Sequence, residues 1–425
     1  MSEVILILGK RCEQSIHWSG TTITADITHL ILITRDRRMA ETKPDQNGAP
    51  NVIIQNPGQS VKPVVPDEEV DRLVKRLYGL VVTTFSPLNS YDDINFYIEV
   101  DQNDHWNPHL KHVDSGYVLK IFNRMDSQRP RLIDAQHAFM EHLKKNGISV
   151  QEPIKNLQGN HFSIEKIPVN GKGDCYSHWV EIRTYLPGTI IANVPYTPKL
   201  LTNAGAFMAR MRLATESFEH PFYRGYYNLW SLSYVPKIRD YLFCVDSSEN
   251  KELIENVLDA YDSEVVPQYS SLPKGCIHGD TNEQNILVQK SDKENPSSEG
   301  DDHFVSGILD YTDVHESYLV VDLALTIAYL MMDADDSLRL DVGSHVISGY
   351  KNHVSLSRAE TDVLPIMVAA RLCQSLVLGL HAYHVNPENG SYVLTSQKAW
   401  PILRQFWNDK DTLLAEWKRI VNTGE

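Results

Sequence analysis

A short segment in the second half of the chain combines a histidine, an aspartate and an asparagine at fixed spacing. His278, Asp280 and Asn285 form the pattern His-x-Asp-x-x-x-x-Asn, which runs directly into an apolar stretch. In phosphoryl transfer a carboxylate must accept the hydrogen bond of the attacking hydroxyl, and hard oxygen ligands must hold Mg²⁺. The spacing therefore predicts Asp280 as the catalytic base and Asn285 as a metal ligand, with His278 bracing the loop from the core.

A second acid follows 25 residues after Asn285, where the apolar run 307–309 ends in Asp310. A kinase fold presents its other Mg²⁺ ligand at the end of such a strand. Tyr311 and Thr312 stand where a protein kinase has Phe-Gly. Taken singly, the first motif could be a turn with a solvated acid and the second a loop-capping aspartate. Their order along the chain favours a shared Mg²⁺ site.

A lysine inside an apolar alternation is the third candidate. Lys120 lies within residues 117–121, and an unpaired ammonium is expensive to bury there. A lysine that binds the α- and β-phosphates of a nucleotide would have a reason for this position, whereas an edge-strand lysine that prevents aggregation is the commoner case. The helix expected over 130–145 should supply an acid for Lys120. Gln136 stands at the expected place and Asp134 lies half a turn away, and either could contact Lys120.

The elements that must position these residues change character along the chain. A β-rich part precedes a mainly helical part, with a strand pair around 286–289 and 304–309. Strands are expected over 80–87, 95–100, 117–122, 161–167 and 178–186. Helical spacing runs over 70–78, with acids at 67–69 before it, and further helices are expected over 130–145, 197–215, 253–266, 318–332, 343–350, 359–383 and 396–421. This order predicts an α+β fold of two lobes.

The predicted organisation has three parts. Residues 1–63 are expected to be an N-terminal extension, mostly disordered, because the polar stretch 41–58 offers little apolar surface to offset ordering entropy. Residues 64–186 are expected to form a nucleotide-binding lobe. Residues 187–421 are expected to form a catalytic and substrate-binding lobe. Residues 290–303 are polar and acidic and predict a solvated hairpin loop.

The net charge of the chain limits the kinds of molecule that it is expected to bind. The 425 residues carry a formal net charge of −15, which argues against nucleic acid or an anionic membrane and suits a cationic small molecule. The longest candidate for a membrane span, 318–332, is interrupted by Asp322 and is too short to cross a bilayer. The N-terminal residues are a poor secretory signal, and the five scattered cysteines fit free thiols. We therefore expect a cytoplasmic protein.

Together these motifs resemble the aminoglycoside phosphotransferase family of small-molecule kinases, which have a protein-kinase-like fold, and within that family the hydroxylysine kinases. The resemblance covers about residues 64 to 420. It is carried by residues 88–96, 184–188, 228–230, 278–288, 306–332 and 371–376.

The resemblance implies a nucleotide site. Lys120 would hold the phosphates, and a turn from Ser90 to Asn95 would cover them in place of a Gly-rich loop. Tyr185 and Leu186 would form the hinge whose backbone meets the base. The family enzyme implies GTP, with ATP as the other possible donor, and Mg²⁺ as cofactor. The implied acceptor is the hydroxyl group of 5-hydroxy-L-lysine.

The turn itself departs from a phosphate-binding loop, because Asp92 and Asp93 would place acids near phosphates. These acids could face away, bind the metal or accept structural amides. An acceptor with two ammonium groups and one carboxylate needs acids and one cation. Asp313 and Glu316 are candidates for an ammonium and Arg371 for the carboxylate. Helix-terminal acids and an internal salt bridge are the structural alternatives.

Asp322, inside an apolar helix, is expected to support the catalytic loop, for instance through His278. A protein kinase is disfavoured, since Gly279 stands where arginine is usual. Other acceptors remain open, namely ethanolamine, choline, homoserine and aminoglycosides. A catalytically inactive nucleotide-binding sensor is the alternative from another class.

Overall fold

The computed structural model describes residues 61–423 except for 91, 113, 115, 169–174, 292–302, 386 and 388–390. The expected extension over 1–63 and the expected hairpin loop over 290–303 therefore lie almost entirely outside the described residues. Val61 is buried, and the Nζ atom of Lys62 donates to the carbonyl oxygen of Ser90 at 2.6 Å. Residues 61 and 62 thus already pack against the first lobe.

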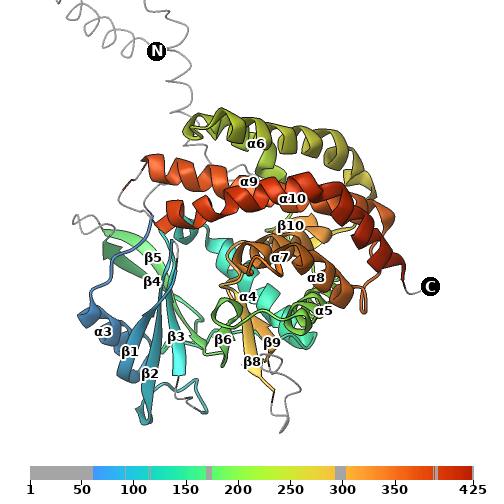
Figure 1. The fold of residues 1–425 in the computed structure, drawn as a ribbon. Coiled ribbons are helices and arrows are strands. Elements are labelled where there is room, and N and C mark those ends of the chain that lie inside the picture. The colour runs from blue at the N-terminus through green and yellow to red at the C-terminus, as the bar shows by residue number, and fades with distance from the viewer. Residues whose placement is uncertain are drawn as a thin grey trace, which may run out of the picture. The chain divides into compact units, whose positions relative to one another are not determined.

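The first lobe is built on a five-stranded antiparallel sheet with the order β1-β2-β3-β5-β4 (Figure 1). Helix α3 (Asp67–Tyr78) precedes it, with three acids in its first turn and a left-handed Gly79 after its last residue. The central strand β3 is buried along its whole length. The strands are β1 (Leu80–Leu88), β2 (Ile94–His105), β3 (Gly116–Ile121), β4 (Ser163–Pro168) and β5 (Cys175–Thr184).

Helix α4 (Pro130–Lys145) has the predicted bounds. A proline at the first helical position loses no hydrogen bond, which favours a helix start there. Four of its apolar residues belong to the core of the helical lobe, namely Ala135, Phe139, Met140 and Leu143. Two others, Leu132 and Ile133, pack with Phe122 and Trp179 of the sheet lobe. This helix therefore links the two lobes through its packing.

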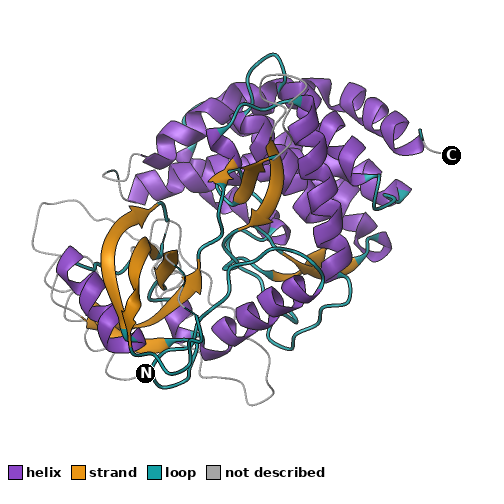
Figure 2. Ribbon diagram, turned by 90° about the horizontal axis from the view of Figure 1, so that it is seen from below, coloured by secondary structure: helices purple, strands orange, loops and turns teal. Residues whose placement is uncertain are grey.

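The second lobe is mainly helical, as Figures 1 and 2 show. Short strands form two small sheets, β10-β7 and β6-β8-β9, and the loop that contains Asp280 lies between β7 and β8. The helices are α5 (Pro198–Thr215), α6 (Ser248–Ala260), α7 (Val320–Asp333), α8 (Val342–Tyr350), α9 (Arg358–Val385) and α10 (Ser391–Asn422). The strands are β6 (Thr189–Ile190), β7 (Lys274–Ile277), β8 (Ile286–Lys290), β9 (His303–Ile308) and β10 (His315–Tyr318).

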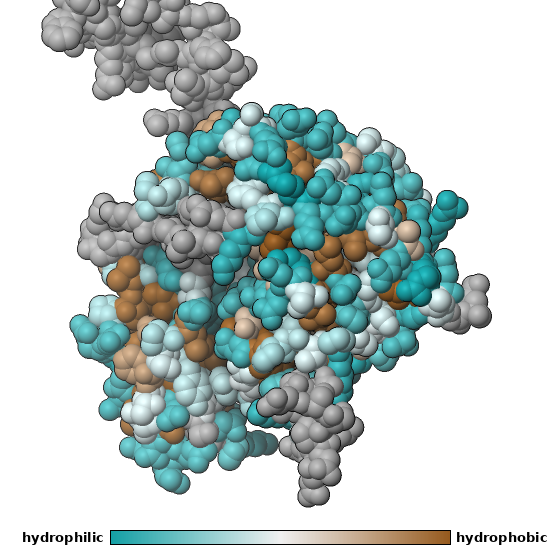
Figure 3. Space-filling view, in the orientation of Figure 1, coloured by the Kyte–Doolittle hydropathy of each residue, from teal (hydrophilic) through white to brown (hydrophobic). Residues whose placement is uncertain are grey.

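Helix α9 is long and apolar enough to cross a membrane by length and composition, but 89% of its most apolar 18-residue window is buried inside the protein. It packs against α7 and α10 as a core helix. On the face seen in Figure 3, hydrophilic residues cover most of this lobe and apolar residues are scattered among them.

The predicted α+β architecture is confirmed, and most predicted helices and strands lie within a few residues of their observed bounds. Three strands were missed. Strands β7 and β10 are four residues long, β6 has only two, and β10 stands just before α7. Such short strands form because a partner distant in sequence is available, and local pattern does not reveal that partner.

Candidate active site

The loop after β7 turns sharply at Gly279, which has a φ of +81°. A Cβ atom at this position would lie 2.4 Å from the carbonyl oxygen of Asp313 and 3.0 Å from the ring of His315. Only glycine fits this left-handed, crowded backbone without strain. The glycine in the motif is therefore explained by the close approach of the segment before β10.

Asp322, on the first turn of α7, holds this loop. Its Oδ2 accepts from the backbone N–H of His278 at 2.8 Å, and its Oδ1 accepts from that of Gly279 at 2.9 Å. The imidazole of His278 instead donates from Nε2 to the carbonyl oxygen of Leu309 at 3.0 Å, and its Nδ1 accepts from Asp280 N–H at 3.3 Å. Asp322 thus contacts the loop through backbone amides and not through the imidazole.

Burial shifts the pKa of both supporting groups toward the neutral form. It lowers the pKa of His278 to about 4, against the opposing effects of Asp310 and of the hydrogen bond to Leu309. It raises the pKa of Asp322 to about 6, against the two backbone N–H donors. The neutral imidazole is consistent with one donating and one accepting nitrogen.

Asp280 lies at the loop surface facing a cavity, with its carboxylate held by two amides. Asn282 donates to both carboxylate oxygens at 2.9 and 3.0 Å, and Asn285 Nδ2 donates to Oδ2 at 2.8 Å and to the Asp280 carbonyl at 2.9 Å. Desolvation raises the pKa of Asp280 to about 6, with Arg371 opposing the rise and Asp310 adding to it. These hydrogen bonds fix the carboxylate and turn the side-chain nitrogen of Asn285 toward Asp280.

Asp310 follows β9 in a left-handed conformation, with a φ of +58°. Aspartate tolerates this region better than most residues. Its Oδ1 accepts from Thr312 Oγ1 at 2.6 Å and from Thr312 N–H at 3.2 Å, and it lies 3.7 Å from Lys120 Nζ. Desolvation would raise the pKa of Asp310, but Lys120 and Thr312 hold it down at about 2. This carboxylate is ionised at neutral pH.

The donor set of Asn285 and Asp310 suits Mg²⁺. Within the described part of the chain, no hydrogen bond reaches Asn285 Oδ1, because the amide nitrogen makes both contacts to Asp280. The Leu309 N–H donates to the Asn285 carbonyl at 2.8 Å, which ties the two segments together. Mg²⁺ is commonly held by one or two such oxygens plus phosphates and water. Among the residues that the structure describes, no three or more His, Cys, Asp or Glu side chains cluster as a metal site would require.

Lys120 lies on β3 with 5% of its side chain exposed, and its Nζ is 2.6 Å from Asp93 Oδ2. Burial would lower the pKa of Lys120, but Asp310 and Asp93 raise it above its ordinary value. The expected partners on α4 do not fill this role. Gln136 is fully buried and its amide makes no hydrogen bond among the described residues, and Asp134 lines a separate hollow.

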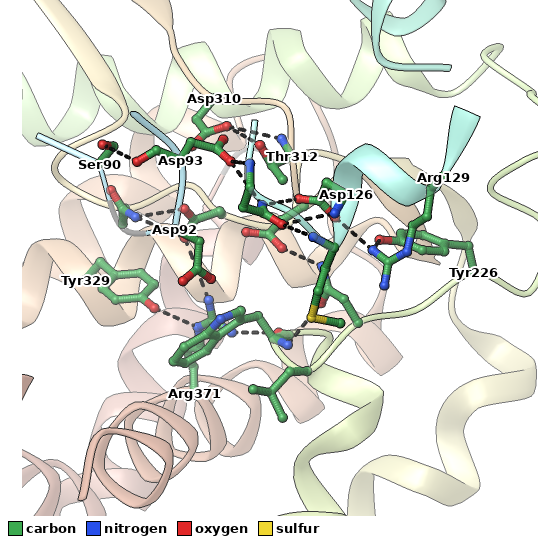
Figure 4. A pocket seen from close by; sticks show the side chains of 18 residues that line it. Ser90, Asp92, Asp93, Asp126, Arg129, Tyr226, Asp310, Thr312, Tyr329 and Arg371 are labelled. Atoms are coloured by element: carbon green, nitrogen blue, oxygen red, sulfur yellow. Dashed lines mark hydrogen bonds and ion pairs between the residues drawn. The ribbon is translucent and has the colours of Figure 1, made fainter. Parts of the chain in front are cut away.

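A cavity of about 300 Å³, lined by residues of both lobes, lies beside Asp93, Asp280 and Asp310 (Figure 4). Acidic side chains surround much of it, and two arginines, Arg129 and Arg371, enter from opposite sides. Its lining comprises Ser90, Asp92, Asp93, Asn123, Met125, Asp126, Arg129, Tyr226, Asn228, Leu229, Trp230, Asp280, Asn282, Asp310, Thr312, Asp313, Tyr329 and Arg371.

Arg371 is 1% exposed and largely committed to the protein. Its Nε donates to the Tyr329 hydroxyl at 3.0 Å, and its Nη1 donates to the Trp230 carbonyl at 2.6 Å and to Gln374 at 2.8 Å. Its Nη2 lies 3.8 Å from Asp280 Oδ1. One edge of the guanidinium therefore faces the predicted base and the cavity.

The two acids predicted to bind an ammonium are separated by the structure. Asp313 lines the cavity, and Asn228 Nδ2 donates to its Oδ1. Desolvation and the nearby Asp280 and Asp310 raise the pKa of Asp313 well above its usual range. Glu316 is exposed on β10 and lines another hollow, because strand residues alternate between faces and buried His315 takes the inward one.

The predicted nucleotide-binding residues lie around the same sheet. Ser90 lines the cavity, and its hydroxyl donates to the Asp93 carbonyl at 2.7 Å. Asn95 on β2 is directly opposite Lys120 on β3, so the two side chains share a face. Tyr185 and Leu186 follow the last strand of the sheet, and the Tyr185 ring contacts that of Tyr97 edge-on at 4.8 Å.

The model of the phosphotransferase enzyme family matches residues 103–351, which is more than half of the chain. The chain belongs to this family. The match includes β3, both predicted metal ligands and the loop of Asp280. The phosphotransferase is similar to hydroxylysine kinase from Xenopus laevis, with 34% identity over 81% of this chain and 90% of that protein. It is also similar to hydroxylysine kinase from Danio rerio, with 32% identity over 84% of this chain and 96% of that one.

Among solved structures, an amicoumacin kinase covers 83% of the phosphotransferase at a TM-score of 0.57 and 15% identity, a likeness of fold. The resemblance stated from the motifs is therefore confirmed. The family and the relatives identify the chain as a small-molecule phosphotransferase that acts on a hydroxyl group. Such a kinase uses a nucleoside triphosphate as donor and usually a divalent metal.

Several residues of the phosphotransferase cavity escaped the sequence analysis. Asp126 and Arg129 form an i,i+3 ion pair at 2.8 Å just before α4, and Arg129 also donates to the Tyr226 hydroxyl at 3.2 Å. Their spacing was a visible signal, but surface pairs of this type are common. Asn228 lay in a stretch that carried the family resemblance, although its contact with Asp313 depends on folding alone.

Proposed function

We propose that this phosphotransferase transfers the γ-phosphoryl group of GTP, or of ATP, to the hydroxyl of 5-hydroxy-L-lysine. One observation carries the proposal: a hydroxylysine kinase is 34% identical over nine-tenths of its own length. The acidic cavity supports it, because an acceptor with two ammonium groups requires carboxylates, and the cavity acid Asp313 is held by the amide of Asn228 and not by a cation of the described residues. The predicted lobe boundary, between residues 186 and 187, directly follows the predicted hinge at Tyr185 and Leu186, which fits a nucleotide site between the lobes.

The proposed mechanism depends on positioning and charge. Asp280 accepts the hydrogen bond of the attacking hydroxyl, and its amide contacts with Asn282 and Asn285 hold it in place. Asn285 and Asp310 would hold Mg²⁺, which would supply charge neutralisation at the phosphates. Lys120 binds the phosphates from the sheet side. Preorganised charge of this kind is usually the largest contribution to catalysis.

The remaining predicted residues would bind the nucleotide and the acceptor. The Ser90–Asn95 turn would lie over the phosphates, and the backbone of Tyr185 and Leu186 would meet the base. Asp313 would bind an ammonium of the acceptor, and the cavity-facing edge of Arg371 would bind its carboxylate. An ammonium beside Asp313 would offset the repulsion that it experiences from Asp280 and Asp310.

Nucleotide consumption by the purified full chain tests the proposal. GTP and ATP are compared with Mg²⁺ and with 5-hydroxylysine, lysine, ethanolamine, choline, homoserine or kanamycin as acceptor. Turnover with hydroxylysine and none with lysine is expected, because only the former has the nucleophilic hydroxyl. Asp280→Asn, folded as judged by its melting curve, is the inactive control.

The outcomes separate the parts of the proposal. Turnover with another acceptor retains the mechanism and overturns the substrate. A faster reaction with GTP supports the donor preference, and equal rates remove it. Nucleotide binding without turnover on any acceptor would favour the inactive-sensor alternative.

A further inference from the structure

Lys120 needs a fixed negative partner. Its side chain is 5% exposed on the central strand of the first sheet. Removing an ammonium from water is costly unless a carboxylate with further hydrogen bonds compensates. A phosphate-binding lysine must also hold one orientation before the nucleotide arrives, since ordering a long side chain reduces affinity.

The helix that packs beside the sheet supplies no such carboxylate. Gln136 is neutral and makes no hydrogen bond among the residues described, and Glu141 is exposed and pairs with Lys145 at 2.7 Å. The apolar face of α4 is packed into the core of the helical lobe. A rotation of α4 toward Lys120 would break that packing.

The cross-strand neighbour of Lys120 is also committed elsewhere. Glu181 lies directly opposite Lys120 in the sheet register. Its Oε1 atom, however, contacts Arg183, and its Oε2 atom lies 2.7 Å from His137 Nε2. Glu181 therefore connects the sheet to α4 through His137 and does not contact the Lys120 ammonium.

Two acids lie near the Lys120 ammonium, and Asp93 is the closer, because Asp310 Oδ1 is 3.7 Å away and belongs to the proposed metal site. Its Oδ2 lies 2.6 Å from Lys120 Nζ. Its Oδ1 accepts from the backbone N–H of Asn123 at 2.7 Å and from Asn123 Nδ2 at 3.0 Å. It is 6% exposed, and Figure 4 shows it between the Ser90 turn and Asp310. Both oxygens are thus fixed, one by the protein backbone and one by the lysine.

We propose that Asp93, from the turn between β1 and β2, is the positioning residue that orients Lys120 for nucleotide phosphates, a role that α4 leaves unfilled. The inference rests on the proposed kinase function of this site. It also assigns a role to one of the two acids of this turn, because Asp93 accepts hydrogen bonds from the Asn123 amides and pairs with the Lys120 ammonium.

The competing interpretation is a self-blocking contact, in which Asp93 occupies Lys120 and must be displaced by nucleotide. The two Asn123 hydrogen bonds favour positioning, since a displaced carboxylate would leave buried donors unpaired. The two interpretations predict opposite signs for the same substitution.

Asp93→Asn is the test, measured as the affinity for GTP and ATP with Mg²⁺ and no acceptor, and then as KM for each substrate. Positioning predicts that nucleotide affinity falls about 10- to 100-fold, as expected for a hydrogen-bonded charge pair, while KM for the acceptor changes less than twofold. A general structural defect would weaken both substrates. Asp104→Asn, at the exposed far end of β2, removes the same charge and is the matched control.

Asp93→Glu keeps the charge and displaces it by one methylene group. It repeats the test if Asp93→Asn does not fold, and a rise of several-fold in nucleotide KM is expected. Unchanged nucleotide affinity in the folded variant, or tighter binding, overturns the proposal, and tighter binding supports the self-blocking contact. Because affinity is measured without acceptor, an error in the assigned acceptor leaves this result unaffected.

Discussion

The catalytic loop and the lysine cradle each hold one charged side chain in a fixed orientation, but by different means. The lysine cradle is Lys120 with the residues that contact its ammonium. In the catalytic loop, Asp280 is fixed by Asn282 and Asn285, which lie two and five residues away. In the lysine cradle, Lys120 is fixed by Asp93, from another strand connection. A local network can be anticipated from spacing, whereas a cradle assembled from separate strands cannot.

The comparison also distinguishes two kinds of support. Behind the catalytic loop, Asp322 holds backbone amides, so loop shape depends on one buried carboxylate. Behind the cradle, Glu181 pairs with His137 and Arg183 and links the sheet to α4. The loop is therefore expected to control turnover, and the cradle is expected to control nucleotide affinity.

The largest effect is expected where the two regions meet. Asp310→Ala removes a proposed Mg²⁺ ligand that also lies 3.7 Å from Lys120. We expect kcat to fall by at least about two orders of magnitude at ordinary Mg²⁺, as for other losses of preorganised charge. Steady-state kinetics on folded enzyme check this result, and near-normal turnover would make the metal assignment wrong.

Gly279→Ala disturbs the catalytic loop and spares the cradle. The new Cβ would lie 2.4 Å from the Asp313 carbonyl at a positive φ, a strain of about 1–3 kcal/mol. We expect a lower melting temperature and a kcat reduced at least about tenfold, with nucleotide affinity nearly unchanged. A parallel loss of nucleotide affinity would show that the two regions are not separable.

Asn228→Ala removes the side-chain donor to Asp313 but leaves the carboxylate in the cavity. Loss of a hydrogen bond costs about 1 kcal/mol, so KM for the acceptor should rise about fivefold. Titration of acceptor at saturating nucleotide measures it. An effect on nucleotide KM alone would contradict the assignment of Asp313 to the acceptor side.

The smallest effect is expected on the cradle side. Gln136→Met replaces a buried amide that makes no hydrogen bond among the described residues, so unfolding free energy should change by less than about 1 kcal/mol or increase. Nucleotide KM should stay within twofold. A large rise in nucleotide KM would restore α4 as the support of Lys120, and urea unfolding with parallel kinetics distinguishes the cases.

The sequence alone predicted the α+β class, the bounds of α4 and the grouping of His278, Asp280 and Asn285, because these depend on local periodicity and short spacing. The strand ending at Asp310 was also predicted, since an apolar run that stops at an acid is visible in one dimension. The family resemblance came from the segments around Asp280 and Asp310 and from residues 88–96, 184–188, 228–230 and 371–376.

Only the tertiary structure decided which side chains meet across long separations. Gln136 and Asp134 on α4 were the predicted neighbours of Lys120, whereas the folded chain brings Asp93 from the turn between β1 and β2 into contact with it. Asp313 and Glu316 are three residues apart, yet the pairing of β10 with β7 sends only Asp313 to the cavity. Burial and strand register are properties of the assembled chain, and they determine which charge acquires a partner.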